Sequence, residues 1–200
     1  MPGRFRAGFV LAVAVGAALA GCATDEPGEP RPGPGTESTS SSAASPTTGT
    51  ASRPKDIKLD GLDPCKVLTT EQMNQLSVVE TDPQETDLSG IGSFPLCDYS
   101  TRGTPRFGYG VGLVTSKGVE HWQGNGNVDV TRIEVSGYPA AQLVLTGTGN
   151  VMCSVAVDVA DGQQLLVDFN PTGDDYSQDQ MCQNAQKAAE LALATLPTLV

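Results

Sequence analysis

The 200-residue chain has little of the chemistry that most metal sites and hydrolases require. It has a single histidine, His121, and none of its five cysteines lies in a Cys-x-x-Cys pair. Because tetrahedral zinc sites draw their ligands mainly from cysteine and histidine, the sequence predicts no metal site. It also lacks a Gly-x-Ser-x-Gly motif, which excludes the nucleophile elbow of an α/β-hydrolase. We therefore expect no cofactor and no catalytic residues.

Basic residues are scarce as well. Twelve Lys and Arg stand against 23 Asp and Glu, so the net charge is −11. A chain this acidic is repelled by the phosphates of nucleic acids and by anionic lipid headgroups. The charge therefore excludes a nucleic-acid partner, and any affinity for a membrane has to come from another source.

No apolar run is long enough to span a bilayer as a stable helix. Residues 7–20 are uncharged and mostly apolar, and they follow Arg4 and Arg6 in the layout of a secretory signal. The run ends in Leu19-Ala20-Gly21-Cys22, which resembles a bacterial lipobox. This resemblance implies cleavage before Cys22 and acylation of its sulfur and new N-terminus. We expect residues 1–21 to be a lipoprotein signal peptide, with an ordinary signal peptide and a chance cysteine as the alternative.

A linker is predicted to follow the lipidated cysteine. Residues 23–55 contain 22 Pro, Gly, Ser and Thr among 33 positions, with no aromatic residue and no aliphatic residue larger than alanine. Such a segment buries too little apolar surface to offset the entropy lost on ordering. We therefore expect Cys22 and a disordered linker over residues 22–55, and one folded domain over residues 56–200. Lipid on Cys22 would hold the domain on the outer face of the cell membrane.

Four cysteines remain when Cys22 is set aside, and an even number in an exported chain predicts two disulfides. Three pairings are open, and the sequence alone does not choose among them. We favour Cys65–Cys97 with Cys153–Cys182, because each bond then joins a predicted helix to a nearby strand. Each would close a loop of roughly 30 residues, which contributes about 3.5 kcal/mol in the chain-entropy model.

The sequence of the folded part predicts an α+β domain. Helix-start signals at Asp63-Pro64 and at Thr69 with Gln72 predict one short helix or two abutting turns over residues 64–76. Ser177 with Gln180 starts a second helix over 178–195, and a short helix is expected at 117–123. Residues 82–93 are expected to be turns. The predicted strands are 77–81, 94–101, 107–113, 128–135, 141–146, 151–160 and 163–169.

Two of these strands carry particular signals. Asp161-Gly162 separates two alternating apolar runs and so predicts a hairpin between them. In 107–113, Gly108, Gly110 and Gly112 alternate with large apolar residues and leave one face bare, so either another backbone packs there or the strand bends. Together the elements predict one mostly antiparallel sheet of six to seven strands with an N-terminal and a C-terminal helix packed on it.

Five features in this order resemble the actinobacterial lipoprotein family called domain of unknown function 3558. They are Asp63-Pro64-Cys65 followed by Val67-Leu68-Thr69, then Cys97-Asp98-Tyr99, Gly137-Tyr138-Pro139-Ala140, the strand cysteine Cys153, and an Ala-rich helix from Cys182 to Pro197. The resemblance covers residues 60–197 and implies lipid anchoring, two disulfides and no established activity. Members often carry Trp where this chain has Tyr99, and tyrosine can keep the packing while adding a hydroxyl.

The candidate ligand surface consists of aromatic residues and the lone histidine. Its residues are Phe107, Tyr109, His121, Trp122 and Tyr138. Aromatics at alternating strand positions also suit a core, and Glu120-His121-Trp122 also suits a short helix whose tryptophan packs inward.

Two functions follow from these observations. The first is a non-enzymatic, extracytoplasmic binding or sensor module whose partner is an envelope protein, a glycan or a small ligand. The alternative is an envelope hydrolase or transferase that uses His121 and nearby carboxylates. That alternative requires His121 to lie within hydrogen-bond reach of a carboxylate in a cleft.

Overall fold

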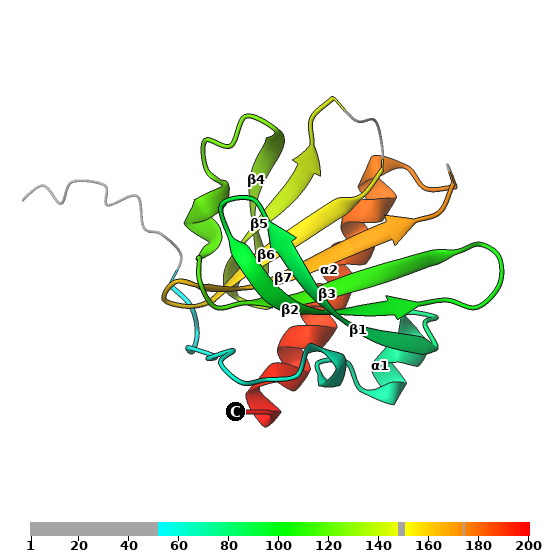
Figure 1. Cartoon of the computed structure of the whole chain (residues 1–200), viewed down its shortest axis with the longest axis horizontal. Coiled ribbons are helices and arrows are strands. Elements are labelled where there is room, and N and C mark those ends of the chain that lie inside the picture. Colours follow the sequence, from blue (N-terminus) through cyan, green and yellow to red (C-terminus); the bar gives the residue numbers. More distant parts are fainter. Residues whose placement is uncertain (1–51, 148–150, 174) are drawn as a thin grey trace, which may run out of the picture. The chain divides into compact units, whose positions relative to one another are not determined.

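The computed structural model describes residues 52–147, 151–173 and 175–200 (Figure 1). Within these ranges the chain forms seven strands, two α-helices and three short 3₁₀-helices. The strands are β1 (Glu80–Leu88), β2 (Gly92–Ser100), β3 (Phe107–Val114), β4 (Val128–Val135), β5 (Tyr138–Leu145), β6 (Cys153–Ala160) and β7 (Gln163–Pro171). The helices are η1 (Pro64–Lys66), α1 (Thr70–Gln75), η2 (Val119–Trp122), α2 (Gln178–Thr195) and η3 (Leu196–Thr198). The predictions for the signal peptide, Cys22 and most of the linker lie outside the described residues.

All seven strands belong to one sheet, in the order β1-β2-β3-β7-β6-β5-β4, and every neighbouring pair is antiparallel. Sequential hairpins build most of the order, and the pairing of β3 with β7 joins the two halves. This confirms the predicted α+β class with a single antiparallel sheet and a C-terminal helix. No helix in the described part of the chain has the length and apolar character needed to cross a bilayer.

The prediction of turns over residues 82–93 is wrong for most of these residues. In the structure β1 runs through it and pairs with β2 from Glu80 opposite Ser100 to Leu88 opposite Gly92. Because β1 is an edge strand and most of its residues are exposed, it needs no alternation of apolar and polar residues. Charged residues and a proline are typical of edge strands, since they discourage pairing with other chains.

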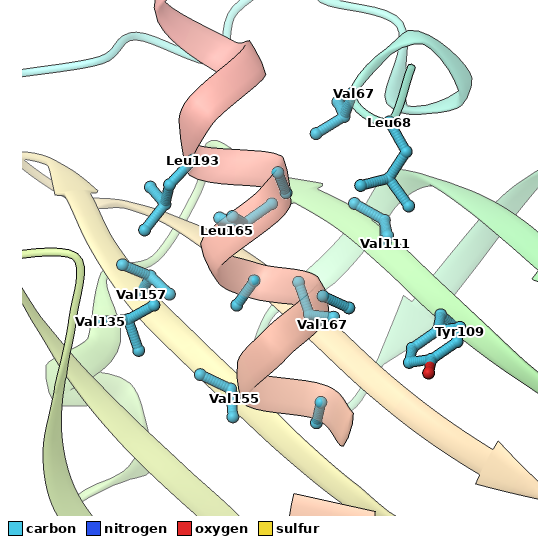
Figure 2. Close-up of a cluster of buried hydrophobic side chains, with 14 of the residues drawn as sticks. Val67, Leu68, Tyr109, Val111, Val135, Val155, Val157, Leu165, Val167 and Leu193 are labelled. Carbon is cyan, nitrogen blue, oxygen red and sulfur yellow. The ribbon is translucent and has the colours of Figure 1, made fainter. Parts of the chain in front are cut away.

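Helix α2 covers the middle of one sheet face, over β6 and β7 (Figure 2). Alanines on its inner side are fully buried, and their small side chains let the helix lie close to the strands. These are Ala185, Ala188, Ala189 and Ala192. Val155, Val157, Leu165 and Val167 of the sheet form the facing layer (Figure 2). This α2 face therefore holds the larger part of the apolar core.

Of the two alternatives predicted for residues 64–76, one short helix or two abutting turns, the structure forms two short pieces. Asp63 caps η1 by accepting a 2.9 Å hydrogen bond from the Cys65 N–H, with Pro64 at the first helical position. The capping box of Thr69 and Gln72 then starts α1. Thr69 has extended backbone angles, φ −72° and ψ 162°, so a continuous helix cannot pass through it. The longer helix is therefore not formed, and only a six-residue α-helix remains.

Two disulfides fix the helical segments to the sheet. Cys65 of η1 is bonded to Cys97 of β2, and Cys153 of β6 is bonded to Cys182 of α2. These are the pairs favoured from the sequence. Their Cα atoms are 5.1 and 5.0 Å apart, within the usual range for disulfides. Two disulfides are typical of domains that fold outside the cytoplasm.

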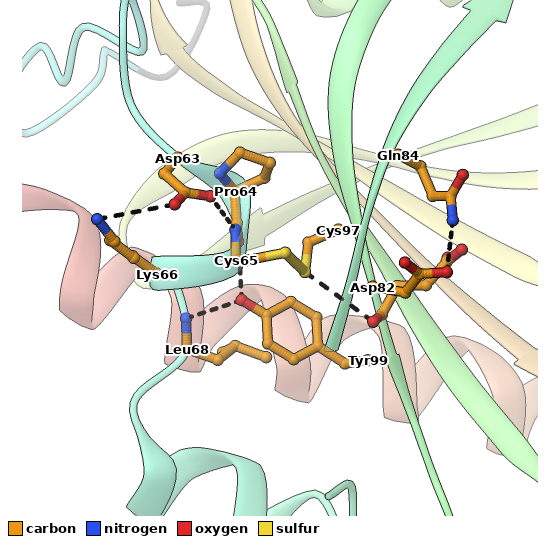
Figure 3. Close-up of a disulfide and its surroundings, with 10 residues drawn as sticks. Asp63, Pro64, Cys65, Lys66, Leu68, Asp82, Gln84, Cys97 and Tyr99 are labelled. Carbon is orange, nitrogen blue, oxygen red and sulfur yellow. Dashed lines mark hydrogen bonds and ion pairs between the residues drawn. A yellow bond between two sulfur atoms is a disulfide. The ribbon is translucent and has the colours of Figure 1, made fainter. Parts of the chain in front are cut away.

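Tyr99 lies next to the first disulfide and holds the η1 segment by hydrogen bonds (Figure 3). Its buried hydroxyl donates to the carbonyl of Pro64 at 2.7 Å and accepts from the Leu68 N–H at 3.4 Å. The hydroxyl thus satisfies two backbone groups of the η1 segment, a role that a tryptophan at this position would not fill in the same way.

A second apolar cluster lies on the sheet face opposite α2. Its buried members are Ile91, Phe94, Leu96, Val114, Trp122, Ala141, Leu143, Ala156 and Leu166. The short helix η2 contributes Trp122 to this cluster. The sheet is therefore buried on both faces near its middle, and its side chains meet solvent at its ends and along the edge strands β1 and β4.

The beginning of the described chain is tied to the β6–β7 hairpin by Arg53. Its guanidinium pairs with Asp158 at 2.7 Å, with Asp56 at 2.9 Å and with Asp161. These carboxylates hold the pKa of Arg53 above its usual value, the Asp161 hydrogen bond most of all. Arg53 therefore lies against the domain, just before the predicted boundary at residue 56.

Candidate ligand pocket

A polar pocket of about 480 Å³ opens at one end of the sheet. Here β1 begins, β2 ends, β3 begins and β7 ends, and residues 101–106 connect β2 to β3 beside it (Figure 1). The residues that line it are Glu80, Ser100, Thr101, Arg102, Gly103, Arg106, Phe107, Gly108, Asn170 and Thr172. We call it the β2–β3 pocket.

Its floor is a single row of paired residues across four strands. Glu80 pairs with Ser100, Ser100 with Gly108, and Gly108 with Asn170. Residues that pair directly across antiparallel strands project from the same face, so the polar side chains surround a position with no side chain. A Cβ at Gly108 would lie 3.0 Å from the Tyr99 carbonyl oxygen, so this position favours glycine.

The β2–β3 connection forms one wall and is fixed at both of its ends. The Phe107 N–H donates to Thr101 Oγ1 at 3.2 Å, and the Thr172 N–H donates to the Arg106 carbonyl at 2.8 Å. Arg102 forms an ion pair with Glu80. In the described ranges no hydrogen bond or ion pair engages the Arg106 guanidinium, so it is the one uncommitted charge in the lining.

A second row, two residues farther along each strand, carries carboxylates. Asp82 pairs with Asp98, Asp98 with Gly110, and Gly110 with Asp168. We call these three aspartates the acidic row. Burial raises the pKa of Asp168 to about 6; a hydrogen bond with Ser154 opposes the shift and the charge of Asp98 adds to it. Burial, and then the charge of Asp82, raise the pKa of Asp98.

The acidic row is not a metal centre in the part of the chain that the structure describes, where no group of three or more His, Cys, Asp or Glu is placed to hold an ion. The position of the acidic row matters for the charge around the pocket. Successive residues on one strand face are roughly 7 Å apart, so the row places negative charge beside the pocket floor, on the same face of the sheet.

The bare face of β3 is explained by neighbouring side chains. A Cβ at Gly112 would lie 2.6 Å from Cε2 of Phe94, so the phenyl ring occupies the space that a larger residue would take. A Cβ at Gly110 would lie 3.3 Å from Oδ2 of Asp168. The glycines predict either a closely packed backbone or a bend. A backbone group, the Tyr99 carbonyl, packs closely only at Gly108, whereas side chains of β2 and β7 fill the space at Gly110 and Gly112.

Two of the predicted ligand residues belong to an aromatic cluster on the α2 face. Phe107 and Tyr109 lie 5.5 and 5.2 Å from Phe169, measured between ring centroids, and Tyr176 completes the group. Tyr109 is only 3% exposed and belongs to the core. Phe107 is half-buried and lines the pocket, so it alone among the five candidates reaches this site.

The other three candidates lie elsewhere. Tyr138 is buried at the start of β5, and Trp122 is buried on the face opposite α2. The His121 ring meets the Trp122 ring edge-on, 5.4 Å away, near the β1–β2 turn at Gly90. No hydrogen bond or ion pair joins His121 to a carboxylate among the described residues, so the geometry gives no support to an acid–base pair there.

Most of the pocket has no signature in the local sequence. Ser100, Arg106, Asn170 and Thr172 are ordinary polar residues at strand ends, and they come together only because β3 pairs with β7. The alternating glycines were the one local signal, since a bare strand position at a sheet end leaves room for a ligand.

The fold and the pocket define a class: an α+β domain with two disulfides and a polar pocket at one end of an antiparallel sheet. The family model described as "Protein of unknown function (DUF3558)" matches residues 17–195. The chain belongs to this family. No curated protein and no solved structure matches the chain.

Proposed function

We propose that this protein is a lipid-anchored domain of the cell envelope that binds a small polar ligand, without chemical conversion, in the β2–β3 pocket. The observation that supports the proposal is the pocket itself. The pocket is open to solvent, its volume is about 480 Å³, and its floor is a row of paired polar residues around a glycine.

The two disulfides and the sequence before Cys22 support the location. Disulfides persist outside the cytoplasm, and the run from Arg4 to Cys22 has the order of a lipoprotein signal. Two or three acyl chains on Cys22 would anchor a chain whose net charge of −11 gives it no attraction for anionic lipid.

Binding suits the pocket better than catalysis does. Its one carboxylate, Glu80, is engaged by Arg102, and the lone histidine lies at η2 rather than in the lining. The remaining groups are hydroxyls, an amide and a guanidinium, which hold a ligand by hydrogen bonds.

The pocket is tested by two-dimensional NMR of ¹⁵N-labelled mature chain (residues 22–200, Cys22→Ser). The probes are a panel of amino acids and neutral and acidic monosaccharides at millimolar concentration. We expect at least one probe to shift the amide signals of Gly108, Asn170 and Thr172. Asn170→Tyr should abolish the shifts by filling the pocket, whereas Asn127→Tyr, on an exposed turn outside the lining, should preserve them.

Shifts that survive in Asn170→Tyr, or a panel that never perturbs these amides, would contradict binding in this pocket.

The anchor is tested separately, by labelling cells that produce the full chain with an alkyne fatty acid. The wild-type chain should take up the label and sediment with membranes, and Cys22→Ser should do neither. A free thiol at residue 22 in a chain released to the medium would refute the anchor and leave the pocket proposal intact.

A further inference from the structure

We infer that the ligand of the β2–β3 pocket is an acidic monosaccharide with a single carboxylate, which Arg106 binds. The inference rests on the proposed function and narrows it to one class of ligand. Three features of the pocket lead to it: one uncommitted guanidinium, a set of free hydrogen-bonding side chains, and the acidic row behind the floor.

Arg106 is the residue suited to the carboxylate. The planar guanidinium presents parallel N–H donors that match the two oxygens of a carboxylate. Arg102, the other cation of the lining, is already paired with Glu80. The backbone of Arg106 is held from β7 by the 2.8 Å hydrogen bond from the Thr172 N–H, which fixes the base of its side chain beside the pocket.

The neutral groups suit the hydroxyls of a sugar. Ser100, Asn170 and Thr172 line the pocket, and within the described residues their side chains have no hydrogen-bond partner. Hydroxyl and amide groups both donate and accept, as sugar hydroxyls do.

The acidic row limits the charge that the ligand can carry. Asp82, Asp98 and Asp168 lie one row behind the floor, on the same face of the sheet. A second negative charge on the ligand would lie about one residue row from these carboxylates and would gain no further cation, because Arg106 is the only uncommitted one in the described lining. A sugar carboxylate should therefore bind more tightly than a sugar phosphate of similar size.

The test is titration calorimetry of the mature chain with D-glucuronate, D-glucose and D-glucose 6-phosphate. We expect glucuronate to bind about tenfold or more tightly than glucose, since a charge-assisted hydrogen bond is stronger than a neutral one. Glucose 6-phosphate should bind more weakly than glucuronate.

Arg106→Gln should reduce the affinity for glucuronate to about the level of that variant's affinity for glucose. Arg106→Lys should retain part of the preference for glucuronate, because lysine keeps the positive charge but lacks the paired N–H donors of the guanidinium. Arg132→Gln removes an exposed arginine of β4, outside the pocket, and should change none of the three affinities. An NMR spectrum of each variant confirms its fold.

Equal binding of glucuronate and glucose overturns the inference, as does a preference that persists in Arg106→Gln. Tighter binding of glucose 6-phosphate overturns the limit to a single charge. If none of the three sugars binds while an amino acid of the wider panel shifts the pocket amides, the inference fails and the proposed function stands. If no probe of that panel perturbs the pocket, both fail.

Discussion

Trp122 and Gln164 are joined by a short buried hydrogen bond, in which the indole Nε1–H donates to the Gln164 side-chain oxygen at 2.6 Å. The amide nitrogen of Gln164 donates in turn to the carbonyls of Lys117 and Gly118. Its neighbour Gln163 faces the other way, accepts from the Leu59 N–H and donates to Asp60. Two adjacent glutamines of β7 thus fasten two peripheral segments to opposite faces of the sheet.

Gln164→Leu should destabilise the domain by about 2–3 kcal/mol, because it keeps the side-chain volume and leaves buried polar groups of the η2 segment without partners. Urea unfolding followed by circular dichroism measures this loss. The emission of Trp122, the only tryptophan, should also shift to longer wavelength as η2 loosens.

Gln163→Leu is the matched control for this change. It should also lower stability, by releasing Leu59, but it should leave the emission of Trp122 unchanged. Equal spectral shifts in the two variants would show that the two glutamines do not act on separate faces.

Gly112→Ala should destabilise the domain by about 1–3 kcal/mol through overpacking. The added methyl group would lie 2.6 Å from Cε2 of Phe94, a ring that is only 3% exposed and has little room to move. Gly126→Ala is the control, because nothing lies within 4 Å of a Cβ there. Thermal unfolding compares the stabilities of the two variants. A Gly112→Ala variant as stable as Gly126→Ala would refute the close packing of Phe94.

These contacts show which parts of the fold could be predicted from local sequence. Helix α2 begins and ends at the predicted residues, because the Ser177 capping box and Pro197 mark its limits in the sequence itself. Strand β4 also has its predicted bounds, since it lies between turn residues. Both elements are specified by residues within a few positions of their ends.

Only the first two residues of β1 lie in the predicted strand 77–81, and the rest of β1 was missed because its stability depends on a partner. The segment ETDPQETDL has a single aliphatic residue and a proline, and it becomes a strand through nine paired positions on β2. The pocket was missed for the same reason. Glu80 and Thr172 come from segments far apart in the sequence, and neither has a local signature of binding. Information of this kind lies in the pairing of strands rather than in the periodicity of one segment.

Tyr99→Phe should lower the free energy of unfolding by about 1–2 kcal/mol, because the Pro64 carbonyl and the Leu68 N–H lose their buried partner. The disulfide Cys65–Cys97 holds the same segment, so the two features should be coupled. In a Cys65→Ser, Cys97→Ser background the effect of Tyr99→Phe should fall towards zero, because the η1 segment is then already loose.

A double-mutant cycle in urea measures this coupling, and the Cys153→Ser, Cys182→Ser background supplies the control. That disulfide joins β6 to α2 and does not contact η1, so the effect of Tyr99→Phe should remain at its full size there. Additive effects of Tyr99→Phe and loss of the Cys65–Cys97 bond would contradict a shared role.

Asp168 should make the domain less stable as the pH rises through its titration. Burial raises its folded-state pKa to about 6, above the value of about 3.9 expected in the unfolded chain. Between these two pH values the folded state holds the proton more strongly, so raising the pH costs stability. At pH 7 this cost is at most about 3 kcal/mol. Urea unfolding at pH 4.5 and at pH 7.5 measures the difference, with the pH values chosen to span roughly this window.

Asp168→Asn should therefore be more stable than the wild type at neutral pH and should show a smaller change between the two pH values. Asp129→Asn removes the same charge from an exposed position on β4 and is the matched control, which should leave the pH difference intact. Because Asp98 faces Asp168 across Gly110, Asp98→Asn should relieve part of the same cost. If Asp168→Asn retained the full pH dependence of the wild type, the half-buried Asp168 carboxylate would not be its source, and charge repulsion spread over the acidic surface would account for it instead.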